Sequence, residues 1–230
     1  MNFGERLIEE YVKRFEQKYS DSSIYNGSLG SMAKIDLKGI TEGEVCKVIK
    51  PFLYEWGRMG RVLGRIEYLN WKSNLASAIM SNCQRLKGFS TKDLAGVKIG
   101  RLGPDIMGCY EPFKGAVGQI AAAKVLHLIC PNFFPLWDNS IAEAVRNEIG
   151  DKSKLNEKVE KFSGRDYVRF MEKIQELISK YEKLLSYLAS QHKKGKLKIL
   201  DECLWWAAHM PASLLFEGKC HITQQHNSTL

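Results

Sequence analysis

An expected hairpin of two helices in this 230-residue chain delivers one carboxylate, that of Asp138. This residue follows the segment Pro135-Leu136-Trp137 and stands where a helix is expected to begin. A single fixed carboxylate can stabilise positive charge that develops on a sugar, or orient an attacking water. The alternative is that Asp138 only caps its helix. Lys124, on the preceding apolar helix, is a second catalytic candidate, unless its stem merely lies along apolar surface with the amine in solvent.

A second pair of residues has the chemistry of a binding pocket. Asp201 and Trp205 are four residues apart, so on a helix they share a face. A carboxylate acceptor and an aromatic platform on one face can hold a planar ring, and Trp137 is a further aromatic candidate. The alternative is that Asp201 is the N-cap of its helix and the tryptophans belong to the core.

A glycine-containing turn between residues 114 and 118 is the best candidate for an anion site. Gly115 and Gly118 are expected to frame a tight turn before an apolar helix, and backbone amides at a helix start bind phosphate. Candidate contacts to a phosphate backbone are therefore Lys114, Gly115, Val117, Gly118 and Gln119. Arg58 and Arg61, which lie among glycines, are added for their charge.

The segments that position these residues show almost only helical periodicity. Apolar residues recur at steps of three and four over residues 2–19, 66–86, 167–188 and 201–210. Loops are expected at 20–33 and at the basic stretch 192–198, a short extended piece at 35–40, and glycine turns between 100 and 108. Thr41 with Glu44, and Ser163 with Asp166, are typical of helix starts. These patterns predict an all-α fold of eight to ten helices.

Composition restricts the class of protein. The chain has 34 Lys and Arg against 26 Asp and Glu, a net charge of +8, which favours a polyanionic partner without identifying it. Its six cysteines form no C-x-x-C pair, so we expect neither a metal nor another cofactor. With no apolar run of membrane-spanning length, we expect no membrane association and an intracellular location, cytoplasmic or nucleoid-associated.

The segment from Gly118 through Ala122, Val125 and Leu126 resembles the second half of a helix-hairpin-helix motif. Together with Asp138 it is similar to the hairpin and catalytic aspartate of the helix-hairpin-helix DNA glycosylase superfamily, which includes endonuclease III and the 8-oxoguanine DNA glycosylases. This resemblance implies an all-α glycosylase-like bundle in two lobes and a DNA partner. On that plan residues 1–230 form one domain, with lobes at 41–137 and at 1–40 plus 138–230.

A second match comes late in the chain. Leu200-Asp201-Glu202-Cys203-Leu204-Trp205 resembles a helix of archaeal 8-oxoguanine glycosylases, in which the aspartate and tryptophan help to hold a flipped purine. Two departures stand beside it. Two residues separate Gly115 from Gly118 where the family usually has one, and Ile120 occupies the position of the family's lysine.

The resemblance thus implies a DNA-repair N-glycosylase for a modified base, such as an oxidised purine. The missing lysine favours a monofunctional route centred on Asp138. Two other classes stay open: a non-catalytic nucleic-acid-binding module that kept the hairpin, and a helical partner-binding protein that exposes the apolar stripe from Tyr167 to Leu188.

Overall fold

The computed structural model describes residues 4–19, 23–65, 69–138, 140–141 and 163–209, and in these ranges every regular element is a helix, as expected for an all-α fold. The α-helices are α1 (Glu5–Lys18), α2 (Ser23–Met32), α3 (Glu42–Glu44), α4 (Gly60–Leu63), α5 (Trp71–Ser81), α6 (Cys83–Ser90), α7 (Ile99–Val117), α8 (Gln119–Ile129), α10 (Gly164–Lys180), α11 (Glu182–His192) and α12 (Lys196–His209). Two π-helical turns, η1 (Val45–Ile49) and η2 (Phe52–Trp56), and a 3₁₀ turn, η4 (Leu94–Gly96), complete the described elements.

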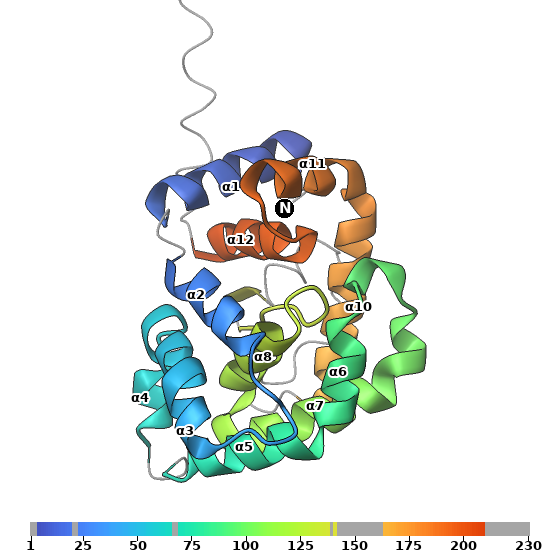
Figure 1. Ribbon diagram of the computed structural model, residues 1–230. Helices are drawn as coiled ribbons and strands as arrows, with labels where there is room; N and C mark the ends of the chain where they lie inside the picture. Colours follow the sequence, from blue (N-terminus) through green and yellow to red (C-terminus); the bar gives the residue numbers. More distant parts are fainter. Residues whose placement is uncertain (1–3, 20–22, 66–68, 139, 142–162, 210–230) are drawn as a thin grey trace, which may run out of the picture.

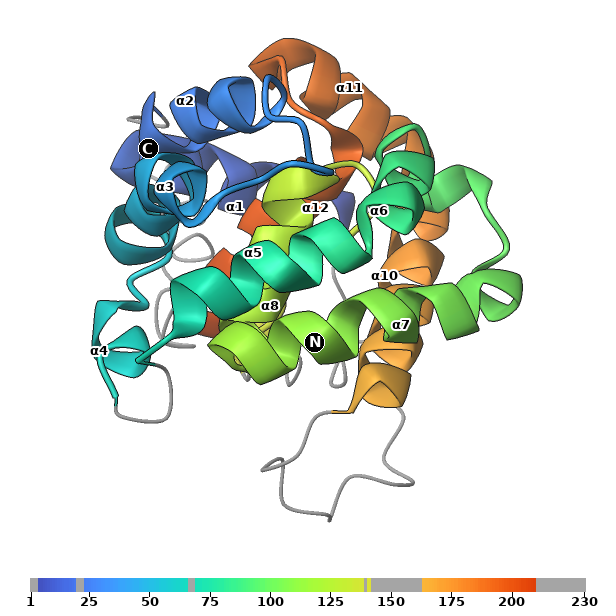
Figure 2. The same cartoon turned by 60° about the horizontal axis from the view of Figure 1, so that its bottom comes forward.

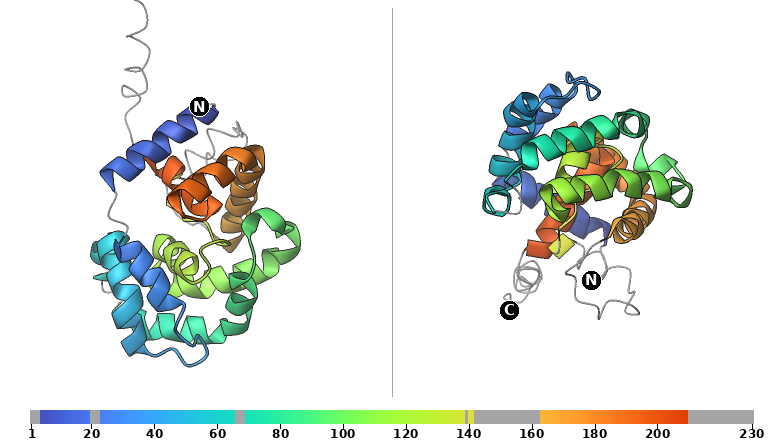
Figure 3. Two further views of the ribbon diagram at one scale, coloured as in Figure 1. Left: turned by 45° about the horizontal axis from the view of Figure 1, so that its top comes forward. Right: turned by 90° about the horizontal axis from the view of Figure 1, so that it is seen from below.

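Helix α8 is the centre of the molecule (Figure 1). Ala121, Ala122, Ala123, Val125 and Leu126 have no exposed surface. α7 packs against α8 and α5, and Figure 2 shows α5 and α7 running side by side in front of α8. α1 packs on α12, whereas α2 packs against η1, η2 and α8 (Figure 3). The elements packed directly on α8 are thus α7, α2 and η2.

The α7–α8 hairpin differs from the expected series of turns. α7 runs without interruption from Ile99 to Val117 and contains both Pro104 and Pro112. Each proline comes four residues after a glycine, Gly100 or Gly108, which is the residue whose carbonyl a helical proline crowds. The freedom of glycine relieves that crowding. Gly115 is helical, and Gly118 alone makes the turn, with φ 79° and ψ 165°.

Sequence signals at helix starts were more reliable than those in loops. The reciprocal caps of Thr41 with Glu44 and of Ser163 with Asp166 are both present. The expected loop at 20–33 was wrong because it contains α2, and the piece at 35–40 forms turns. The segment 66–86, expected to form one helix, contains two helices that meet at Asn82, and its Leu69 is 71% exposed.

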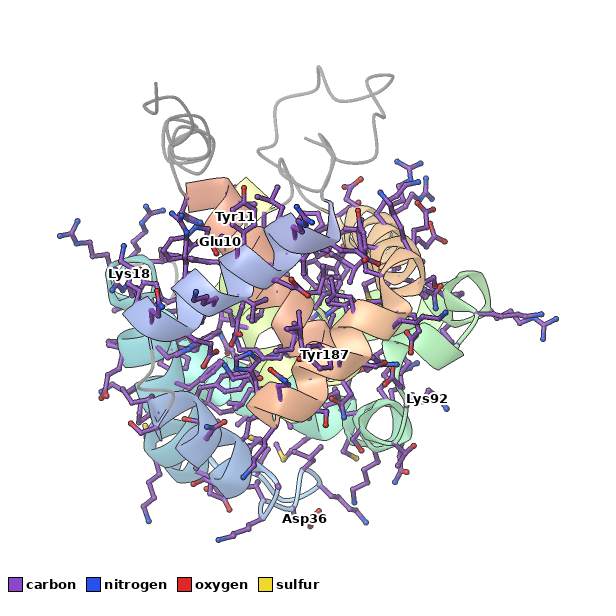
Figure 4. All side chains as sticks on the ribbon, turned by 90° about the horizontal axis from the view of Figure 1, so that it is seen from above. Glu10, Tyr11, Lys18, Asp36, Lys92 and Tyr187 are labelled. Atoms are coloured by element: carbon purple, nitrogen blue, oxygen red, sulfur yellow. The ribbon has the colours of Figure 1, made fainter. Side chains whose placement is uncertain are left out.

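The apolar stripe from Tyr167 to Leu188 belongs to the core. It is divided at Tyr181 between α10 and α11, and α10 packs chiefly on α7. Tyr167, Met171, Ile174, Ile178 and Leu185 are all at most 1% exposed. The stripe is therefore covered within the molecule and cannot be the exposed interface of a partner-binding protein. Viewed from above, α1 lies across the surface with Lys18 near its C-terminal end (Figure 4).

Over the described ranges, every helix is too short or too polar to cross a membrane.

Candidate active site

A cavity of about 590 Å³ opens among α1, α2, η2, α8, α12 and the segment that follows α8. Its volume suits a ligand the size of a nucleobase or larger. It is lined by Phe15, Lys18, Tyr19, Ile24, Tyr25, Glu55, Trp56, Gly57, Arg58, Lys124, Leu136, Trp137, Asp138, Ile141, Lys194, Lys198, Asp201, Glu202, Trp205 and His209. Asp138, Lys124, Asp201, Trp205, Trp137 and Arg58, all selected from the sequence, are thus brought together.

Asp138 is held at the cavity by an aromatic segment. Phe133 and Phe134 are fully buried below it, and Tyr167 donates a hydrogen bond of 2.8 Å to the carbonyl oxygen of Pro135. The Oδ1 atom of Asp138 accepts a hydrogen bond of 2.8 Å from the amide of Ile141. Asp138 therefore accepts a capping hydrogen bond and also lines the cavity, so its two possible roles do not exclude each other. The rest of the helix expected at 138–149 lies outside the described residues.

Lys124 projects from α8 into the same cavity. Its Nζ donates a 2.7 Å hydrogen bond to the carbonyl oxygen of Gly57 and lies 5.8 Å from the centre of the Trp56 ring. Burial lowers the pKa of this amine, an effect that the carboxylates of Asp138 and Asp201 oppose. A lowered pKa increases the fraction of the amine that is uncharged and nucleophilic. The expectation of an amine that extends into solvent was wrong, because Lys124 bonds to a backbone carbonyl inside the protein.

Asp201 is not the N-cap of its helix. α12 begins at Lys196, after Lys193 has ended α11 in a left-handed conformation with φ 52°. Asp201 therefore lies within the helix and is only 6% exposed. Burial raises the pKa of its carboxyl group to about 7, and the nearby Lys198 opposes this rise. The capping alternative is excluded, and Asp201 lines the cavity while it pairs with Lys198 at 3.5 Å.

The two candidate tryptophans differ in their surroundings. Trp205 is partly exposed and stacks on His209, with ring centres 4.5 Å apart, so that one of its faces is occupied. The rings of Phe15 and Tyr19 meet it edge-on at 5.7 and 5.1 Å. Trp137 is 3% exposed and meets Phe170 edge-on at 4.6 Å. Trp205 thus offers a ligand more surface than Trp137.

The residues proposed for backbone contact are divided between two places. Arg58 is exposed at the cavity, and Arg61 is exposed on α4. Lys114, Gly115, Val117, Gly118 and Gln119 form the α7–α8 turn and do not line the cavity. Val117 has no exposed surface, in either its side chain or its backbone, and Lys114 pairs with Glu111 at 3.4 Å.

The basic stretch 192–198 is largely neutralised inside the molecule. Lys194 contacts both Glu16 and Glu202, Lys196 lies 2.8 Å from Glu182, and Lys198 pairs with Asp201 and Glu202. The stretch was expected to be a loop, but α12 already begins at Lys196. Lys194 and Lys198 face carboxylates in the interior, whereas the pair of Lys196 with Glu182 lies at the surface.

The deep part of the cavity contains residues that sequence reasoning missed. Lys198, Tyr25 and Glu202 all line it and are buried. The spacing of Lys198, Asp201 and Glu202 at i, i+3 and i+4 is the signal that would have found them. Tyr25 lay in a segment interpreted as a loop, so its pattern carried no such signal.

Within the described part of the chain, no three His, Cys, Asp or Glu side chains are arranged to hold a metal ion. Comparison of the chain with protein-family models, curated proteins and solved structures found no significant match. What the chain does must therefore be argued from the cavity and its residues.

Proposed function

We propose that the chain is a base-excision DNA-repair protein, an N-glycosylase that removes a modified base such as an oxidised purine. The supporting observation is that Asp138, Lys124, Asp201 and Trp205 line one cavity. They come from α8, the segment after it and α12, and two separate segments that resemble one superfamily contain Asp138 and the pair Asp201 and Trp205. A base in a duplex must leave the stack to react, and it then needs a pocket with polar and aromatic walls.

Asp138 supplies the charge that this hydrolysis needs. Breakage of an N-glycosidic bond leaves positive charge on the sugar while the electron pair leaves with the base. A carboxylate at the cavity wall stabilises that charge and orients a water toward the sugar carbon. The hydrogen bond from Ile141 to Oδ1 fixes the carboxylate, so it is already oriented before substrate binds.

Lys124 gives this site a second route, although Ile120 occupies the position of the family's lysine. Its uncharged Nζ attacks C1′ of the sugar while the C1′–N bond breaks, and the base leaves with that electron pair and takes up the proton that the amine gives up. The C1′–O4′ bond then breaks, O4′ takes up the second amine proton, and an imine forms between Nζ and C1′. The observation that favours this route is that the partly buried amine of Lys124, whose pKa is lowered by burial, lines the same cavity as Asp138.

The test is excision from a panel of duplex and single-stranded oligonucleotides with oxidised, deaminated or alkylated bases, followed by alkali to cut abasic sites. We expect cleavage on at least one lesion and its loss, by about a hundredfold or more, in Asp138→Asn. Asparagine is also a good N-cap, so the fold is retained. Asp36→Asn is the matched control, because Asp36 is 69% exposed and does not line the cavity.

Borohydride separates the two routes. Covalent trapping of the oligonucleotide that disappears in Lys124→Met indicates the imine route, whereas excision without trapping indicates water. Excision by Asp138→Asn at the rate of the unsubstituted protein would exclude the proposed mechanism.

The second candidate function is a non-catalytic nucleic-acid-binding module. It is favoured by the hairpin itself, since the turn at Gly118 and the half-buried start of α8 lie outside the cavity. Salt-dependent binding with every lesion left intact would support this candidate.

A further inference from the structure

The carbonyl oxygen of Gly57 holds the Lys124 amine at the cavity wall. Nζ of Lys124 donates a 2.7 Å hydrogen bond to this oxygen and lies 5.8 Å from the ring centre of Trp56. Both contacts come from the end of η2, and Lys124, Trp56, Gly57 and Arg58 all line the cavity. A hydrogen bond on one side of the amine and a ring on another restrict how the amine is oriented. Its position is thus set by the turn that ends η2.

The turn that ends η2 has an unusual backbone. η2 is a π-helical turn, closed by a 2.7 Å hydrogen bond from the amide of Gly57 to the carbonyl oxygen of Phe52. The next residue, Arg58, is left-handed with φ 52°, and the amide of Met59 donates to the carbonyl oxygen of Leu53 at 2.8 Å. π-Helical turns and left-handed residues other than glycine are both enriched at functional sites. Both occur here in the turn that carries the acceptor for the amine.

The two residues of the turn have opposite steric requirements. A Cβ at position 57 would lie 2.8 Å from the carbonyl oxygen of Leu53, so the peptide that presents the acceptor needs glycine. At position 58 glycine would adopt the left-handed conformation without steric cost, whereas arginine adopts it against its preference. The turn therefore directs a backbone acceptor to Lys124 and a cationic side chain to the cavity.

We propose that Gly57 and Arg58 position the Lys124 amine for the imine route, Gly57 by accepting one N–H and Arg58 by holding the turn in its left-handed form. The uncharged amine then has one hydrogen and its lone pair left, and both point away from the Gly57 oxygen, which leaves the lone pair free to face the cavity. This inference rests on the lysine route of the proposed function and adds the residues that orient its nucleophile. Displacement of the amine by about 1 Å lowers the rate of attack strongly.

Lys124 also caps η2, because a lysine that bonds to a carbonyl at the end of a helix stabilises that end. A cap alone predicts a loss of stability on substitution, and no change in how the amine reacts with a bound sugar. The experiment therefore compares two aldehydes. Formaldehyde reaches the amine from any direction, whereas C1′ of an abasic site in bound duplex DNA is held in one place.

Trapping on a preformed abasic site needs no base excision. Nζ adds to the C1′ aldehyde, and water leaves with the aldehyde oxygen and two hydrogens of the amine. Borohydride then reduces the imine that remains to a stable amine. At saturating protein, we expect Gly57→Ala to slow this single-turnover trapping by about tenfold or more.

The labelling of Lys124 by formaldehyde and cyanoborohydride is measured by mass spectrometry relative to Lys98, which is exposed and does not line the cavity. We expect this ratio to stay within about threefold in Gly57→Ala, because an aldehyde free in solution needs no oriented amine. Gly88→Ala is the matched control for both assays, since a Cβ at Gly88 meets nothing within 4 Å. Trapping and labelling that fall together in Gly57→Ala would reduce Gly57 to a structural role.

A pair of variants at position 58 tests the turn without a new side chain at Gly57. Arg58→Asn and Arg58→Val both remove the charge that, after burial, also lowers the pKa of Lys124. Asparagine accepts the left-handed conformation, whereas the β-branched valine does not. At saturating protein we expect trapping by Arg58→Asn to be about tenfold or more faster than by Arg58→Val. If Gly57→Ala does not fold, this pair decides.

The outcomes separate this inference from the function on which it rests. Trapping on abasic DNA that falls in Gly57→Ala, without excision of any lesion, would support the inference and reject the glycosylase. Equal trapping by Gly57→Ala and the unsubstituted protein, or by the two Arg58 variants, would overturn the inference and leave the glycosylase intact. Excision of a lesion without any trapping would overturn it too, because the water route needs no amine. Absence of both trapping and excision would reject both.

Discussion

Asp201 couples the cavity to protein stability through its proton. The pKa of its carboxyl is about 7 in the folded protein, against an ordinary value of 3.8. At pH values between these two pKa values, Asp201 is protonated in the folded protein and ionised in the unfolded chain. The proton on Asp201 therefore contributes fully to the free energy of unfolding below about pH 4, and this contribution is lost as the pH rises through 7. Lys198, Glu202 and Asp138 are the charged groups around it.

Asp201→Asn therefore has a predictable dependence on pH. We expect the free energy of unfolding of the unsubstituted protein, minus that of Asp201→Asn, to fall by roughly 2–4 kcal/mol between pH 4 and pH 8. Urea unfolding at several pH values measures this difference, and Asp36→Asn is the control for loss of an exposed carboxylate. A difference that stays constant or grows with pH would contradict the assignment of the raised pKa to Asp201.

His127 joins three segments through a defined tautomer. Its Nδ1 lies 2.8 Å from the carbonyl oxygen of Phe134, which can only accept, so Nδ1 carries the hydrogen. The Nε2 atom, 2.7 Å from the hydroxyl of Tyr25, is then the acceptor. Burial lowers the pKa of His127 to about 3, which keeps the ring neutral. The histidine is therefore structural, and it holds α2 and the segment before Asp138 onto α8.

Removal of the Tyr25 hydroxyl tests this link. Tyr25→Phe keeps the ring beneath Lys198 and leaves Nε2 of His127 buried without a donor, so we expect a loss of about 1–3 kcal/mol in the free energy of unfolding. Tyr187→Phe is the matched control, since Tyr187, labelled on α11 in Figure 4, is 56% exposed. Chemical denaturation measures both, and an equal effect of the two substitutions would argue against the link.

The α7–α8 hairpin depends on one glycine. The φ of 79° and ψ of 165° at Gly118 lie in a region that only glycine adopts readily, whereas Gly115 is helical and a Cβ there meets nothing within 4 Å. We expect Gly118→Ala to lower the melting temperature, at a cost of about 1–3 kcal/mol. Gly115→Ala should raise the melting temperature, through a gain of about 0.5–1 kcal/mol in the free energy of unfolding. Stabilisation by both substitutions would show that the turn can form without a positive φ.

The same hairpin shows which elements could be predicted from sequence. Caps such as those at Thr41 and Ser163 are local hydrogen-bond patterns, so the sequence contains all their parts. The length of α7 could not be predicted, because its prolines end a helix in most contexts and are accommodated here by glycines and by packing on α5 and α10. α2 was missed because its serines and glycines carry no apolar period, although its buried residues pack on α8.

A residue of the candidate site could be predicted only where helix spacing or the resemblance to a family pointed to it. Asp138, Asp201 and Trp205 were selected from the sequence and meet at the cavity. The partners that define the cavity come from α1, α2 and η2, far away in the chain, and no spacing in the sequence relates them to α12. Lys198 was misassigned because charge alone does not distinguish a solvated lysine from one held between carboxylates. The division into two lobes stays a prediction.

The whole molecule carries a net charge of +8, yet three lysines of the basic stretch are already paired with carboxylates. Only unpaired cations release counterions from DNA, so the salt dependence of binding should depend on exposed residues at the cavity such as Arg58 and Lys18. We expect Arg58→Ala to weaken DNA binding and to reduce the slope of log affinity against log salt by about 1.

Lys196→Ala, a loss of the same charge from a residue paired with Glu182, should leave that slope nearly unchanged. Fluorescence anisotropy of a labelled duplex over a series of salt concentrations measures both slopes. If the two substitutions reduce the slope equally, net charge rather than the cavity rim directs the binding. If neither does, DNA contacts this protein elsewhere, with the start of α8 and Lys114 as the next surface to substitute.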